Sequence, residues 1–176
     1  MYNGDNGRIM LKIVKSLSEL NTAQFLAVYA ESNRKTGQIH YPNLSEEQQI
    51  NFADADLISY LREDFFRGRV AFCFIWIEEG VYKSVLRIEP YRDGLLLHAL
   101  ETAPNARKMG YAYKLVMAVL EYLKTVKYQA VYSHVHKQNI PSMLLHKKCG
   151  FQQVSDSAVY IDGTVTQNSC TMMVKL

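Results

Sequence analysis

The chain has 176 residues, of which 48% are hydrophobic and 21% are charged, and its formal net charge is +3. This composition argues against a disordered chain, and the length suits one domain with a substantial core. The nearly balanced charge gives no sign of a nucleic-acid-binding protein, and no apolar run approaches the roughly 20 residues of a membrane span. We therefore expect a single cytoplasmic domain over residues 1–176 with neither nucleic acid nor membrane as a partner.

The N-terminal segment is polar and rich in residues typical of turns. This predicts a disordered extension over about residues 1–9, and not a signal peptide. The three cysteines, Cys73, Cys149 and Cys170, are odd in number and far apart, so buried thiols are favoured over disulfides. There is no C-x-x-C motif, and the histidines lack the spacing of metal ligands, so no metal site is predicted.

The first part of the chain predicts one strand followed by two helices. Alternating apolar residues favour a strand over 10–15, and apolar positions at helical spacing favour a helix over 20–33. Residues 36–42 are predicted to form a loop. Ser45 and Gln48 fit a capping box that begins a second helix, which should end near residue 66.

The remainder predicts three strands, then a helix, a strand, a helix and two closing strands. The expected ranges are strands 71–77, 82–88 and 95–100, a helix to about 124, a strand over 130–135, a helix from 141 to the stop at Gly150, and strands 152–156 and 170–176. Asp162-Gly163 predicts an extra hairpin between the last two strands. The fold class is therefore α/β, with the order βααβββαβαββ.

A six-residue loop between strand 95–100 and the following helix is the most informative segment. It consists of Arg107, Lys108, Met109, Gly110, Tyr111 and Ala112 and reads R-x-x-G-x-A. A loop that runs into a helix start presents free backbone N–H groups and the positive end of the helix dipole, which together bind phosphate groups. Gly110 allows the backbone to approach such a group without a Cβ.

This motif resembles the Q/R-x-x-G-x-G/A motif of the GNAT family of N-acetyltransferases, which holds the pyrophosphate of acetyl-CoA. A second stretch, residues 139–151, resembles the family's N-x-x-A/S-x-x-L-Y-x-x-x-G-F motif. The resemblance implies a mixed, mostly antiparallel sheet flanked by helices. It also implies that the backbones of Thr102 and Ala103 pair with the pantetheine arm, and that Asn139 binds this arm or caps its own helix.

The resemblance also suggests catalytic residues. His98 is the first candidate for the base that deprotonates the amine, because His98-Ala99-Leu100 resembles a stretch of the arylalkylamine N-acetyltransferases in which a histidine removes the proton. Glu101 is the rival: strand periodicity places it on the opposite face, unless a bulge changes that parity. His146 stands where the family usually has the tyrosine that protonates the leaving thiolate. It either replaces this acid or has lost the role.

The resulting hypothesis is an acyl-CoA-dependent N-acyltransferase, most simply one that moves acetyl from acetyl-CoA to a primary amine of a small molecule or peptide by direct attack. The alternative is a non-catalytic acyl-CoA-binding or regulatory module, and a homodimer is possible in either case. In this fold the acceptor site is bounded by the first two helices and the last hairpin. These segments supply Glu31, His40, Tyr41, Asp54, Asp56, Phe65, Phe66, Tyr160 and Asp162, whose acids and aromatic rings suit a cationic amine.

Overall fold

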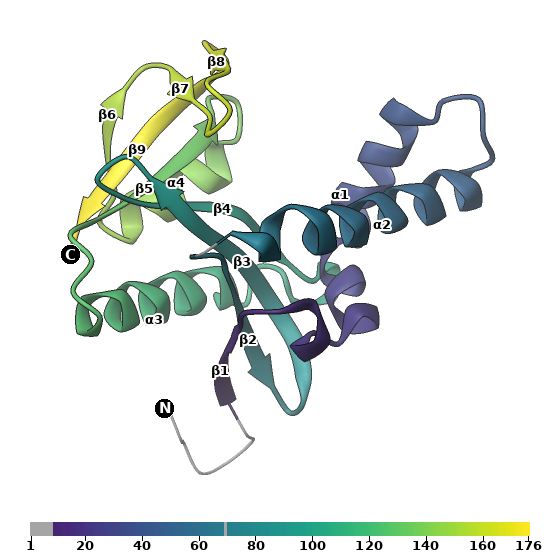
Figure 1. Ribbon diagram of the computed structural model, residues 1–176, viewed down its shortest axis with the longest axis horizontal. Helices are drawn as coiled ribbons and strands as arrows, with labels where there is room; N and C mark the ends of the chain where they lie inside the picture. Colours follow the sequence, from purple (N-terminus) through teal and green to yellow (C-terminus); the bar gives the residue numbers. More distant parts are fainter. Residues whose placement is uncertain (1–8, 69) are drawn as a thin grey trace.

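The computed structural model describes residues 9–68 and 70–176, so most of the expected N-terminal extension lies outside the described residues. A seven-stranded sheet runs through the molecule, with helices on both of its faces (Figure 1). The strands are β1 (Ile9–Val14), β2 (Phe72–Glu78), β3 (Val81–Tyr91), β4 (Gly94–Thr102), β5 (Ala130–His136), β6 (Gln152–Ser155), β7 (Ala158–Val159), β8 (Val165–Thr166) and β9 (Ser169–Lys175). The α-helices are α1 (Thr22–His40), α2 (Glu46–Glu63), α3 (Tyr111–Thr125) and α4 (Ile140–Lys148), and short 3₁₀ helices cover Leu17–Glu19, Phe65–Arg67 and Pro104–Ala106.

The strand order in the sheet is β1-β2-β3-β4-β5-β9-β6. All neighbours are antiparallel except β4 and β5, which pair in parallel only from Leu95–Val131 to Leu97–Ser133. The predicted α/β class and element order are confirmed. The predicted hairpin is also present, as the pair β7–β8, and Gly163 adopts a φ of 86° in its turn. None of the described helices is long and apolar enough to cross a bilayer.

The two faces of the sheet carry different layers. Leu97 and Val135 belong to the main core together with Leu115 and Val119 of α3. α4 covers the same face, because Met143 on this helix contacts Cys170 on β9, the register partner of Val135. The opposite face carries α1 and α2, which lie together on the other side of the sheet from α3 (Figure 1). Residues of β4 and β5 therefore face one of two separate helical layers.

The predicted loop over residues 36–42 is wrong, because α1 continues as a helix to His40 and ends just before Pro42. Gly37 lies within this last part of the helix. A Cβ at this position would lie 2.4 Å from the carbonyl oxygen of Gln49 on α2. The absence of a Cβ at Gly37 thus permits the two helix backbones to touch.

The predicted helix boundaries near residues 45 and 150 are confirmed. Ser45 and Gln48 form a capping box at the start of α2. After α4, Gly150 takes a φ of 91°, and the N–H of Phe151 donates to the carbonyl of His146. The three cysteines are buried free thiols, as the sequence predicts.

Gly37→Ala tests the contact between α1 and α2. Alanine favours a helix by about 1 kcal/mol over glycine. The clash with Gln49 should nevertheless dominate and lower the free energy of unfolding by about 1–3 kcal/mol. Denaturant unfolding would measure this, with Gln38→Ala on the exposed side of the same helix as the control. An equal or higher stability for Gly37→Ala would contradict the close approach.

Candidate active site

β4 contains a bulge that changes which of its side chains share a face. Val85 pairs with Glu101, and Arg87 pairs with His98, so one residue of β3 stands opposite the two residues Ala99 and Leu100. Ala99 adopts a φ of 50°, in the left-handed region. His98 and Glu101 therefore project from the same face of the sheet, toward α1 and α2. Strand periodicity alone placed them on opposite faces, and the bulge overturns that placement.

Two hydrogen bonds hold the bulge from outside the strand. The hydroxyl of Tyr29 on α1 donates to the carbonyl of Ala99 at 2.6 Å, and the hydroxyl of Ser84 on β3 donates to the carbonyl of Glu101 at 2.7 Å. Tyr29 is buried, and burial raises the pKa of its hydroxyl, so it remains a proton donor at all ordinary pH values. The left-handed conformation at Ala99 is thus fixed by packed neighbours.

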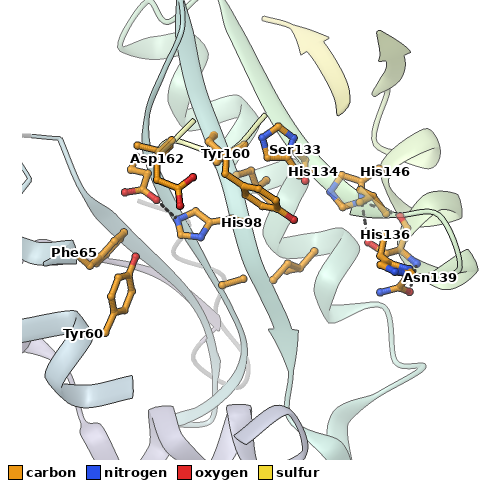
Figure 2. Close-up of a pocket in the computed structure, with 18 of the residues that line it drawn as sticks. Tyr60, Phe65, His98, Ser133, His134, His136, Asn139, His146, Tyr160 and Asp162 are labelled. Carbon is orange, nitrogen blue, oxygen red and sulfur yellow. Dashed lines mark hydrogen bonds and ion pairs between the residues drawn. The ribbon is translucent and has the colours of Figure 1, made fainter. Parts of the chain in front are cut away.

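A cavity of about 870 Å³ opens where β4 and β5 cease to pair after Leu97 and Ser133. It is lined from both faces of the sheet (Figure 2). His98 and His134 line it from the α1–α2 face, whereas Val135 and His146 line it from the face covered by α3 and α4. The cavity therefore passes through the sheet, and reactants can approach from opposite sides.

His98 lies beside a carboxylate within this cavity. Its Nε2 atom is 2.9 Å from Oε1 of Glu89, although the ring N–H is not aligned for a hydrogen bond, so the contact becomes an ion pair when His98 is protonated. Burial lowers the pKa of His98, and Glu89 opposes this effect. A neutral imidazole beside a carboxylate can accept a proton at neutral pH.

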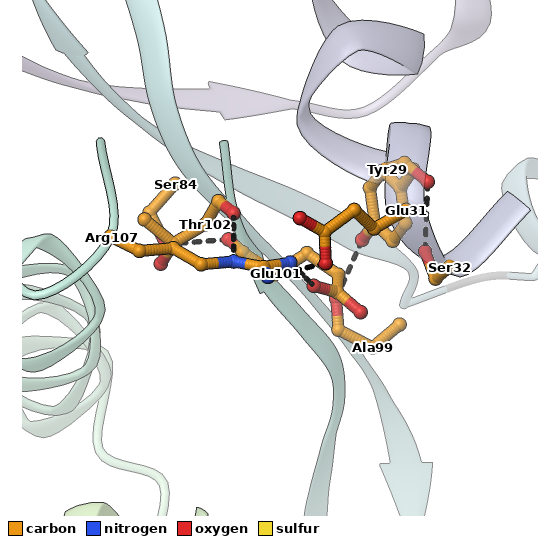
Figure 3. A network of polar contacts seen from close by, with 8 residues as sticks. All are labelled: Tyr29, Glu31, Ser32, Ser84, Ala99, Glu101, Thr102 and Arg107. Atoms are coloured by element: carbon orange, nitrogen blue, oxygen red, sulfur yellow. Dashed lines mark hydrogen bonds and ion pairs between the residues drawn. The ribbon is translucent and has the colours of Figure 1, made fainter. Parts of the chain in front are cut away.

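Glu101 belongs to a second polar network on the same face of the sheet (Figure 3). The Arg107 guanidinium lies 2.5 Å from Glu31 and 3.9 Å from Glu101, and its Nε donates weakly to the carbonyl of Thr102 at 3.4 Å. Burial raises the pKa of Glu101, while Arg107 opposes the rise. The Arg107 side chain thus ties its loop to α1, and any contribution of this residue to phosphate binding comes from its backbone.

The loop 107–112 has the geometry expected of an anion site. Within the described part of the chain, none of the backbone N–H groups from 107 to 113 donates to another backbone group. Gly110 is the N-cap of α3 with a φ of 81°, and the position of a Cβ there faces open space. Lys108 and Met109 are exposed, whereas the Tyr111 side chain is buried and bonded to Glu78. Ala112 follows as the second residue of α3.

The three residues predicted to contact the pantetheine arm, Thr102, Ala103 and Asn139, already make hydrogen bonds within the protein. The backbone N–H of Ala103 donates to the carbonyl of Lys83 at 2.9 Å, and the pairing of Thr102 and Ala103 with the pantetheine arm stays a prediction. Thr102 Oγ1 is hydrogen-bonded to Ser84. Asn139 lines the cavity and also caps α4, because its side chain accepts from the N–H of Ser142 at 3.2 Å. Its predicted capping role is confirmed.

His146 is 3% exposed and lines the cavity with one free nitrogen. Its Nδ1 lies 2.8 Å from the carbonyl oxygen of Ser142, an acceptor, so Nδ1 carries the proton of the neutral ring. Nε2 is buried and has no protein partner among the described residues. Burial lowers the pKa of His146 and so favours the neutral form. In this tautomer Nε2 accepts a hydrogen bond and cannot donate a proton.

The predicted acceptor-site residues are only partly brought together. Phe65, Tyr160 and Asp162 line the large cavity, while His40 and Asp56 line a second cavity of about 390 Å³ between α1, α2 and β4. The other predicted residues line neither cavity. Glu31 forms an ion pair with Arg107, Tyr41 donates a hydrogen bond to Asp56, and Asp54 accepts one from Asn33. Phe66 also lies outside both cavities.

Sequence reasoning missed four residues that the structure places on these walls: Tyr60, Arg87, Glu89 and His134. A signal was present for two of them. Arg87 and Glu89 alternate with the buried residues Leu86 and Ile88 in β3, so one face of an otherwise buried strand had to be polar.

A comparison with known protein families identifies the family of this chain. The sequence model of the acetyltransferase (GNAT) family matches residues 26–151, which include both motifs and every strand that lines the large cavity. The chain belongs to the GNAT family. A search of curated protein sequences finds no significant match.

Solved GNAT structures share the fold over nearly the whole chain. PaiA N-acetyltransferase from Thermoplasma acidophilum, in complex with coenzyme A, is 14% identical, with a TM-score of 0.62 over 95% of this chain and 99% of its own. An acetyltransferase from Streptococcus agalactiae is 15% identical, with a TM-score of 0.66 over 96% and 98%. The ribosomal-protein-S18-alanine N-acetyltransferase from Escherichia coli is 17% identical, with a TM-score of 0.57 over 94% of each chain. At these identities the likeness concerns the fold.

Glu89→Gln tests the electrostatic coupling at His98 in this GNAT protein. Glu89 raises the pKa of His98, so its replacement should lower that pKa further below the ordinary value. NMR titration of the His98 ring protons would measure the change. Asp64→Asn removes a carboxylate that lines the same cavity but is not among the groups that shift the pKa of His98, so it should leave the value as it is. A rise in the pKa of His98 on Glu89→Gln would contradict the pairing.

Proposed function

We propose that this GNAT protein is an acyl-CoA-dependent N-acyltransferase that uses acetyl-CoA and acts on an amine within the large cavity. One observation carries the proposal: the cavity opens between β4 and β5 beside a histidine whose lowered pKa favours the neutral ring, and the loop that follows β4 presents backbone N–H groups without backbone acceptors. The T. acidophilum relative, which was crystallised with coenzyme A, supports the choice of cosubstrate.

The loop 107–112 fits a pyrophosphate. Several N–H groups converge there without protein acceptors, and the N-terminus of α3 adds its positive dipole end. Gly110 supplies the left-handed φ and leaves the space beside it open. We assign Arg107, Lys108, Met109, Gly110, Tyr111 and Ala112 to the pyrophosphate through their backbones. Thr102 and Asn139 are assigned to the pantetheine arm.

The acyl transfer follows from this arrangement. The amine nitrogen attacks the thioester carbonyl carbon, a carbon–nitrogen bond forms, the carbon–sulfur bond breaks, and the thiolate leaves. His98 takes the proton of the amine, and Glu89 stabilises the imidazolium that results. Glu101, now on the same face, is the rival base, but its carboxylate is held by the Arg107 network.

We propose a different role for His146 from that of the family's tyrosine. With Nδ1–H bound to Ser142, the neutral ring offers a lone pair at Nε2, and its lowered pKa disfavours the imidazolium that could donate a proton. His146 therefore shapes the cavity wall and accepts a hydrogen bond, and the leaving thiolate takes its proton from water. A non-catalytic acyl-CoA-binding module is the competing function, and the observation that favours it is the histidine at position 146, where the family usually has a tyrosine.

Gly110→Glu tests the cosubstrate site. Added bulk and negative charge should remove measurable acetyl-CoA binding, because several hydrogen bonds to phosphate oxygens would be lost. Gly163→Glu is the matched control: Gly163 has a similar positive φ and open space around it, but it lies in the β7–β8 turn. Calorimetry on both folded variants would decide. Equal affinity of wild type and Gly110→Glu would overturn the assignment.

His98→Ala and Glu101→Gln separate the two candidate bases. His98→Ala should lower kcat/KM by about ten- to a thousand-fold at neutral pH, the usual cost of losing one acid–base group. In the wild type, kcat/KM should rise with pH through a pKa below the ordinary histidine value, since only the neutral ring accepts the proton. His98→Ala should remove this limb of the profile.

The opposite pattern would reassign the base. If Glu101→Gln causes the loss and His98→Ala leaves both rate and pH profile intact, Glu101 is the base. If the wild type binds acetyl-CoA but acylates no amine in a broad panel, the non-catalytic alternative is correct.

A further inference from the structure

Arg87 is a buried cation whose hydrogen-bond donors are only partly used by the described residues. It is 8% exposed, and its Nε and Nη1 atoms are buried without an acceptor among residues 9–68 and 70–176. Removing a charge from water costs several kcal/mol per ion unless it is paired, so such a group calls for an anion. The carboxylate whose pKa Arg87 helps to lower is Glu89, and this carboxylate is already engaged by His98.

The surroundings of Arg87 hold its guanidinium in place. Its Cζ atom lies 5.2 Å from the ring centroid of Tyr60 and 5.5 Å from that of Phe65. These contacts with aromatic faces fix the plane of the group but leave its in-plane N–H donors unused. A planar guanidinium with free N–H groups is suited to bind the two oxygens of a carboxylate.

Arg87 also lies next to the proposed reaction centre. It is the direct register partner of His98, and both side chains project from the same face of the sheet. The ring centroid of Phe65 lies 5.5 Å from Cζ of Arg87 and 6.1 Å from the ring centroid of His98, and Figure 2 shows Phe65 beside His98. Arg87 lines the second cavity, and Tyr60 and Ala99 line both cavities, so the two spaces adjoin at this point.

We propose that the acceptor of the acyl transfer is an amine that also carries a carboxylate, an amino acid in its simplest form, and that Arg87 binds this carboxylate while the amine lies at His98. The amine half of this proposal rests on the proposed acyltransferase function. The charges of the site match such a dipolar substrate, with Glu89 beside the amine and Arg87 beside the acid. A polyamine would instead bring a second cation against a buried cation.

Matched pairs of substrates test the proposal. Acetyl transfer from acetyl-CoA would be measured with amino acids and with the amines made by decarboxylating each of them. We expect kcat/KM for the preferred amino acid to exceed that of its decarboxylated counterpart at least about 30-fold, as for a buried charge pair. Arg87→Met should remove this preference by lowering the rate on the amino acid and sparing the amine.

One further measurement and one further variant show whether Arg87 is merely structural. Arg87→Met keeps an unbranched, flexible side chain and removes a buried charge that is only partly paired, so its Tm should equal or exceed that of the wild type. Arg92→Met is the matched control, because Arg92 also lies over two rings, those of Tyr91 and Tyr132, but is exposed. It should leave the substrate preference unchanged. A large fall in Tm for Arg87→Met with no change in preference would overturn the proposal.

A binding measurement that needs no catalysis tests the carboxylate site independently of the proposed acyltransferase function. Calorimetry with N-acetyl amino acids probes the carboxylate site even in an inactive protein, and we expect binding to the wild type that Arg87→Met abolishes. If that binding occurs but no amine is ever acylated, the acyltransferase function fails and the carboxylate site stands. If amines without a carboxylate are acylated as well as amino acids, the function stands and the role of Arg87 is wrong.

Discussion

One extra residue in β4, held in a left-handed conformation at Ala99, decides which side chains meet in the large cavity. Without it, Glu101 would face the layer of α3, and the strand could continue to pair with β5. With it, His98 and Glu101 face α1 and α2, and β4 leaves β5 after three paired residues. Tyr29 holds the bulge from α1, so the first helix is part of the site although it carries neither motif.

The arrangement of charges follows from the same geometry. Burial lowers the pKa of His98 and of His146, and this favours the neutral ring on both faces of the sheet. The hydrogen-bonding and charged partners of the two rings then give the rings different roles. Glu89 prepares His98 to accept a proton, whereas the Ser142 carbonyl fixes the proton of His146 at Nδ1 and leaves Nε2 as a buried acceptor without a partner among the described residues. Two histidines that look alike in the sequence thus have different capacities.

The sequence predicted the element order because hydrophobic periodicity and end signals were strong in most segments. Ser45 with Gln48, and Gly150 with Phe151, each fixed a helix end through local hydrogen bonds. The loop predicted over residues 36–42 was wrong because the role of Gly37 depends on a distant backbone, that of Gln49. The sequence raised a bulge near Glu101 as an alternative but could not place it at Ala99, since an apolar strand shows no local sign of where an extra residue lies. The partners of His98 and Arg107, namely Glu89 and Glu31, come from segments far apart in the chain.

The central claim is that the opening between β4 and β5 is where the cosubstrate lies, with its phosphate groups on the loop before α3. An amide-resolved NMR titration of the isotopically labelled protein with coenzyme A measures this most directly. The account predicts that the largest shift changes fall on the N–H groups of residues 107–113 and on the cavity walls at Asn139 and His146. Changes confined to other parts of the chain, or no saturable change at all, would contradict it.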